Sequence, residues 1–114
     1  MSENKLADLS MDFAVNIVKL CDSIRGHSVL TNQLIRSGTS VGANIREANY
    51  AHGKADFAAK LQIALKECYE SEYWIELMFR TNIIIKEQFE SLKNQSGPIR
   101  RMLIASINPV KGAQ

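Results

Sequence analysis

The stretch FAAKLQIALKECYESEYWIELM, residues 57–78, determines the fold class. Apolar or small side chains recur in it at alternating steps of four and three, at Phe57, Leu61, Ala64, Cys68, Ser71, Ile75 and Met78. A mean step of about 3.5 residues keeps these side chains on one helix face and turns that face toward nearly aligned neighbours. The stretch therefore predicts one long helix of a helix bundle.

The same helical period fills most of the remaining chain. It predicts an all-α fold, an antiparallel up-down four-helix bundle that forms a single domain over residues 1–114. The expected helices lie at about 4–25, 28–52, 54–80 and 84–107, followed by a disordered tail at 108–114.

Two prolines affect the last helix. Gly97 and Pro98 interrupt it, and a proline inside a helix removes a hydrogen bond and clashes with the preceding turn. A kink or a break is therefore expected, and the unbroken apolar register favours a kink near Pro98. Asn108 and Pro109 are expected to end the helix.

The composition is that of an ordinary soluble globular domain, with 46% hydrophobic and 23% charged residues. No signal peptide and no run of about 18 apolar residues is present, so we expect a cytoplasmic protein. Cys21 and Cys68 have no ligand-like spacing and fall on apolar stripes, which predicts buried free thiols. A chain this short has a modest core, so an extra apolar face would favour self-association.

The stretch RSGTSVGAN, residues 36–44, looks at first like a phosphate-binding loop. The apolar register passes straight through it from Leu34 to Val41 and Ile45, whereas a Walker-type loop needs a preceding strand and a Gly-Lys-Ser/Thr ending. We therefore predict a helix, with Gly38 and Gly42 forming a groove for a closely packed neighbour. That neighbour is a helix of the same bundle or of another subunit.

A second apolar flank lies beside the seam of the third helix, at Ile63, Tyr69, Tyr73, Trp74, Leu77 and Phe79. One core needs only one stripe, so the surplus suggests a subunit interface carried by Tyr73 and Trp74. A wide core stripe with Tyr and Trp at its wet edge explains the same pattern. Both interpretations stay open at this stage.

Residues for catalysis or metal binding do not form a recognisable pattern. Neither His27 nor His52 follows a glutamate by three residues, as di-iron bundles require, and there is no haem attachment motif. The glutamates of the third helix suit an exposed surface rather than a paired acid and base. We expect no enzyme activity, no catalytic residue, no metal and no cofactor.

Basic side chains on the second helix are the best candidates for a ligand contact. Arg36, Arg46 and Tyr50 project to one polar side, and Lys54 follows just beyond the turn. Arginine near an aromatic ring suits phosphate contact and base stacking, so Arg36, Arg46 and Lys54 are candidate nucleic-acid-binding residues. An ordinary solvated helix face explains them equally simply.

Three segments, QLIRSGTSVGANIREANYA, KADFAAKLQIALKECYESEYWIELM and the later IRRML, resemble a bacterial protein family. The family was first noticed as reading frames in intervening sequences of 23S ribosomal RNA genes. Most members have no established activity. The resemblance implies an antiparallel four-helix bundle that assembles into a homopentamer. It also implies that a recurrent motif of the second expected helix, which is mainly structural, includes Ser37, Gly38, Val41, Asn44, Ile45 and Glu47. Arg36 and Arg46 match basic positions of that motif, where a phosphate contact would be expected.

A relative of that family, the accessory variability determinant of diversity-generating retroelements, binds nucleic acid and partners a reverse transcriptase. The resemblance thus implies RNA or DNA as a possible partner, and a reverse transcriptase as another. We expect a non-catalytic homo-oligomeric bundle that binds nucleic acid. The alternatives are a protein–protein scaffold without nucleic acid and an accessory protein of a retroelement reverse transcriptase.

Overall fold

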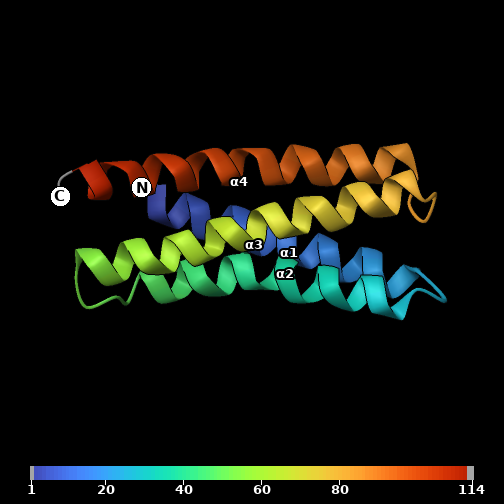
Figure 1. The fold of residues 1–114 in the computed structure, drawn as a ribbon, viewed down its shortest axis with the longest axis horizontal. Coiled ribbons are helices and arrows are strands. Elements are labelled where there is room, and N and C mark those ends of the chain that lie inside the picture. The colour runs from blue at the N-terminus through green and yellow to red at the C-terminus, as the bar shows by residue number, and fades with distance from the viewer. Residues whose placement is uncertain (1, 113–114) are drawn as a thin grey trace.

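Four long helices account for nearly all of the residues that the structure describes. The computed structural model describes residues 2–112, and the side chains of residues 5–108. The helices are α1 (Ser2–Ser23), α2 (Ser28–Ala48), α3 (Lys54–Arg80) and α4 (Lys86–Gly112). They run alternately up and down in a rod measuring 46 × 21 × 20 Å, as Figure 1 shows. The predicted antiparallel four-helix bundle is confirmed.

The core is a single column of side chains along the bundle axis. Each helix packs against two neighbours in the order α1, α2, α3, α4 and back to α1, with no diagonal contact among the described residues. The predicted seam of α3 is buried from Leu61 to Met78, but Ala58 takes the first position, and Phe57 is only half-buried. The largest fully buried side chains are Phe13, Ile17, Leu34, Ile45, Leu61, Ile75, Met78, Ile99 and Leu103.

The stretch of small residues at 36–44 lies in the middle of α2, as predicted. A Cβ placed on Gly38 would lie 3.1 Å from two carbons of Ile17, and one on Gly42 would lie 3.2 Å from Ser10 Oγ. Both distances are tighter than ordinary van der Waals contact, so α1 approaches α2 as closely as the missing side chains allow. The neighbour that fills the glycine groove is therefore α1 of the same chain.

The second helix ends earlier than the sequence suggested, at Ala48 instead of near residue 52. The amide of Tyr50 donates to Glu47 O at 3.0 Å and the amide of Ala51 to Ala48 O at 3.1 Å. These bonds span three residues instead of four, so the chain tightens into a turn. Tyr50 thereby leaves the helix, and His52 is exposed instead of standing at the end of an apolar face.

The fourth helix is continuous through Gly97 and Pro98, so the alternative of a break is wrong. Ile99, Leu103 and Ile107 are all buried after Pro98, and this packing outweighs the one hydrogen bond that proline removes. A kink near Pro98 stays a prediction.

The expected end at Asn108 and the disordered tail at 108–114 are also wrong, because α4 continues to Gly112. Buried Ile107 holds the turn just before Pro109, so the helix has an anchored turn from which to continue. Residues 113–114 lie outside the described residues.

Both cysteines are buried free thiols, as predicted. Burial raises the pKa of Cys21 to about 11 and that of Cys68 to about 12. Each Sγ donates to a backbone carbonyl of a neighbouring helix, Cys21 to Thr31 O at 3.7 Å and Cys68 to Ser96 O at 3.8 Å. Their reactivity as nucleophiles is correspondingly low.

None of the helices within residues 2–112 combines the length and the apolar character needed to cross a lipid bilayer.

The close contact between α1 and α2 yields a stability prediction. Gly38→Leu should lower the free energy of unfolding by about 3 kcal/mol or more, because the new side chain overlaps Ile17 in a filled core. Urea unfolding followed by circular dichroism measures the change. Ala43→Leu, on the exposed side of the same helix, is the matched control and should leave stability within about 0.5 kcal/mol. Equal midpoints for the two variants would refute the groove.

Candidate nucleic-acid interface

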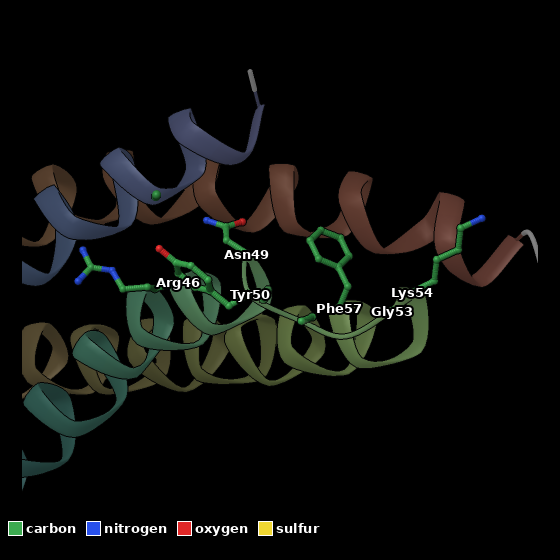
Figure 2. A pocket seen from close by; sticks show the side chains of 9 residues that line it. Arg46, Asn49, Tyr50, Gly53, Lys54 and Phe57 are labelled. Atoms are coloured by element: carbon green, nitrogen blue, oxygen red, sulfur yellow. The ribbon is translucent and has the colours of Figure 1, made fainter.

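An open hollow lies at the end of the bundle where α2 turns into α3. It has a volume of about 720 Å³ and takes its walls from the turn, the first turn of α3 and the start of α1. Figure 2 shows the labelled side chains around it. The lining residues are Ala7, Arg46, Ala48, Asn49, Tyr50, Ala51, Gly53, Lys54 and Phe57.

Two cations flank this hollow. The Arg46 guanidinium lies toward one side and the Lys54 ammonium toward the other, with Asn49, Tyr50 and Phe57 between them (Figure 2). Among the described side chains neither cation forms an ion pair within 4.0 Å. The structure thus places two of the three predicted nucleic-acid-binding residues on the walls of one hollow, where no described side chain pairs with either of them.

No acidic side chain is among the described residues that line the hollow. The nearest carboxylates along the chain have partners of their own. Glu47 pairs with Lys60 at 2.9 Å, and Asp56 Oδ2 accepts the backbone amide of His52 at 3.3 Å. Among the described residues, the charged side chains that line the hollow are thus the two cations.

Tyr50 provides an exposed aromatic surface at the hollow. Its side chain is 80% exposed, and its hydroxyl makes no hydrogen bond among the described residues. Asn49 adds an amide with both a donor and an acceptor, and half-buried Phe57 adds a second ring. Sequence reasoning placed Tyr50 on the helix and missed Asn49 and Phe57 as lining residues. The turn that gathers them is formed by backbone hydrogen bonds, which no side-chain pattern indicates.

Arg36, the third predicted phosphate contact, faces α3 instead. Its guanidinium pairs with Glu67 at 3.3 Å and also with Glu70, whose Oε2 accepts the indole N–H of Trp74 at 3.0 Å. The hydrogen bond that Arg36 donates to Glu70 is the largest cause of the raised pKa of Arg36, and the hydrogen bond that Trp74 donates to Glu70 is the largest cause of the lowered pKa of Glu70. These four residues form a polar clasp between α2 and α3.

The remaining glutamates of α3 are also engaged within the chain. Glu72 accepts from Ser96 Oγ at 2.5 Å and from Arg100 Nε at 3.2 Å, which ties α3 to α4. Glu76 pairs with Arg80 at 2.7 Å along the helix. The acidic segment thus serves largely to join helices, and little of its charge is free for a partner.

The second apolar flank of α3 divides into two parts. Trp74, Leu77 and Phe79 are half-buried, and the Phe79 ring stacks on Phe89 with centroids 4.3 Å apart. Ile63, Tyr69 and Tyr73 are exposed, Tyr73 by 60%, with the Tyr73 ring edge-on to Trp74 at 5.0 Å. The wide-stripe interpretation therefore fits the first group, and only the second remains available to a subunit or protein contact.

A metal centre is not apparent in residues 2–112, since no three side chains of His, Cys, Asp or Glu converge there.

Comparison with known proteins identifies a family and a similar solved structure. The model of a family described as 23S rRNA-intervening sequence protein matches residues 2–105. A crystal structure of a protein of unknown function from the S23 ribosomal protein family of Bacteroides thetaiotaomicron is similar throughout, with a TM-score of 0.90 and 49% identity. The match covers 95% of this chain and 99% of that one. No curated protein matches.

The clasp around Glu70 yields a prediction about acid titration. Its depressed pKa means that Glu70 stabilises the fold above its usual titration range, and that this contribution is lost as the pH falls through the lowered value. Trp74→Phe and, separately, Arg36→Ala should each move the pKa of Glu70 upward, because each removes a donor to the carboxylate. Carboxyl carbon NMR titration measures the shift. An unchanged Glu70 pKa in both variants would contradict the clasp.

Proposed function

The chain belongs to the 23S rRNA-intervening sequence protein family, and we propose that it is a non-catalytic homo-oligomeric bundle that binds nucleic acid between Arg46 and Lys54. The observation that carries the ligand is the hollow at the α2–α3 turn. Among the residues that the structure describes, it combines two cations that form no ion pair, an exposed tyrosine and no acidic lining residue.

Phosphate contact follows from this arrangement. Lysine and arginine that approach a nucleic acid displace its condensed counterions, and this release supplies most of the sequence-independent affinity. A cation already held by carboxylates must first give up those partners, so Arg46 and Lys54 are better placed for this role than Arg36. The net charge of the chain is only +2, so we expect binding concentrated at this one end rather than along a whole basic face.

Nothing in this hollow favours the retroelement alternative. An accessory role beside a reverse transcriptase would call for a broad basic surface, whereas Arg36, Arg80 and Arg100 are all held by glutamates.

The ligand half of the proposal is tested by salt dependence. Arg46→Ala with Lys54→Ala should weaken binding of a labelled RNA or DNA, and should reduce the slope of log K against log salt by about 2. Fluorescence anisotropy between about 50 and 200 mM salt measures both quantities. Arg80→Ala, an exposed arginine at the other end of α3, is the matched control and should bind like the parent. A double variant that keeps the parent's slope would remove the hollow as the phosphate site.

Exposed apolar side chains support the homo-oligomeric half. Met11, Val15 and Val18 follow one side of α1 at steps of four and three, and Ile63, Tyr69 and Tyr73 lie exposed on α3. A domain of 114 residues leaves a large fraction of its surface in water, and exposed apolar side chains grouped on one helix favour association. A pentamer, which the family resemblance implies, would bury part of it.

The assembly is tested by sedimentation. We expect a mass near five times the 12.8 kDa of one chain. Tyr73→Glu should lower that mass, because it places a charge in the proposed contact, whereas Tyr50→Glu, at a tyrosine that is also exposed but lies in the turn, should not. A monomer for the unchanged protein would overturn this half without affecting the ligand half.

A further inference from the structure

We propose that the hollow at the α2–α3 turn holds one unpaired nucleotide of a single strand, with its base stacked on Tyr50. This inference rests on the proposed function and specifies its ligand, because binding through phosphates alone would not distinguish a single strand from a duplex. The argument uses the exposed ring, the position of the cations and the composition of the other hollows.

The ring of Tyr50 is available for stacking. It is 80% exposed, it belongs to a turn outside both helices, and it lines the hollow instead of covering the core. Every base has an aromatic face, so an exposed tyrosine binds bases regardless of their identity. In a duplex those faces are covered by neighbouring base pairs. A ring of this kind therefore selects a base that is already unstacked.

The two cations stand at the two ends of the hollow. In Figure 2 Arg46 lies beside Tyr50 and Lys54 lies beyond Phe57, so a strand that runs along the hollow would meet Arg46 next to the stacked base and Lys54 further along its backbone. A volume of about 720 Å³ lies in the range of pockets that hold small ligands. The Asn49 amide lies beside the ring and offers a donor and an acceptor to a base edge.

The other exposed tyrosines of the chain lie in a different electrostatic setting. Tyr69 and Tyr73 line a hollow of about 310 Å³ between α3 and α4, together with two carboxylates, Glu72 and Glu76, and two cations, Lys93 and Arg100. Arg100 is held by Glu72, so the charged lining of this hollow carries no net positive charge to attract a phosphate. Tyr69 also lines a hollow of about 420 Å³ that has one cation, Lys66, and no acidic residue among its described lining residues. The hollow at Tyr50 differs in having two cations, and Tyr73, whose hollow contains carboxylates, provides the control.

The same chemistry is present in a free mononucleotide. Two observations favour the strand. The hollow is open at the end of the bundle instead of enclosed, and its cations stand apart on two sides, whereas the single phosphate group of a mononucleotide would be held best by converging donors. The experiment below distinguishes binding of a free mononucleotide from binding of a single strand.

The test compares three probes by fluorescence anisotropy: a labelled 12-nucleotide single strand, the same sequence as a blunt duplex, and an unlabelled mononucleotide as competitor. The unchanged protein should bind the single strand roughly 5- to 150-fold more tightly than the duplex, the range that stacking one base provides. Tyr50→Ala should abolish this preference and retain salt-dependent binding to both. Tyr73→Ala should keep the preference. Tyr50→Trp should also keep it, and its added emission should be quenched by the single strand.

Each contrary result has a definite meaning. Equal binding of strand and duplex, or a Tyr50→Ala variant that keeps the preference, overturns the stacking inference and leaves the proposed function standing. Competition by the mononucleotide at the affinity of the strand overturns the assignment to a strand. Failure of both labelled probes to bind overturns the inference together with the proposed function.

Discussion

The close approach of α1 and α2 at Gly38 and Gly42 is the contact on which the rest of the bundle depends. With Ile17 and Ser10 seated against bare backbone, α2 is fixed in rotation and in height relative to α1. The rotation of α2 determines which neighbours the side chains on its other faces contact. It directs Ser37 into the core, where its Oγ accepts a hydrogen bond from Ser71 Oγ at 3.0 Å, and it directs Arg36 toward the glutamates of α3. Two glycines thereby set the geometry of the α2–α3 interface on the opposite side of the helix.

The second organising feature is the use of charged side chains. Some of them join neighbouring helices, and the others face the solvent. Carboxylates of α3 are drawn to Arg36 on one side and to Arg100 and Ser96 on the other. Exposed ion pairs contribute little stability individually, but these fix which helices are neighbours. Because the glutamates of α3 are held along the middle of that helix, none of them lines the hollow near Lys54, where the charged residues of the described lining are two cations. The charge of that lining is thus a by-product of how the helices are held together.

Much of this fold follows from the sequence, because the apolar period of residues 57–78 and the register through Leu34, Val41 and Ile45 are properties of single helices. Features that depend on the contact between two helices do not follow from the sequence of either helix. Whether α1 or another subunit fills the glycine groove, and whether Arg36 faces a ligand or Glu70, is decided by tertiary packing. The turn at Tyr50 was missed because the apolar pattern continues to His52 while the backbone hydrogen bonds do not. Pro109 was read as a stop, although buried Ile107 anchors the helix just before it.

The turn between α2 and α3 has a consequence for how this protein can change over evolutionary time. Asn49, Tyr50, Gly53 and Lys54 are all exposed and contribute almost nothing to the buried column that stabilises the bundle. Substitutions there are therefore nearly free of a folding penalty. Members of one lineage could drift in ligand preference at this turn while the bundle itself stays under strict constraint, so a shared architecture is compatible with divergent binding roles.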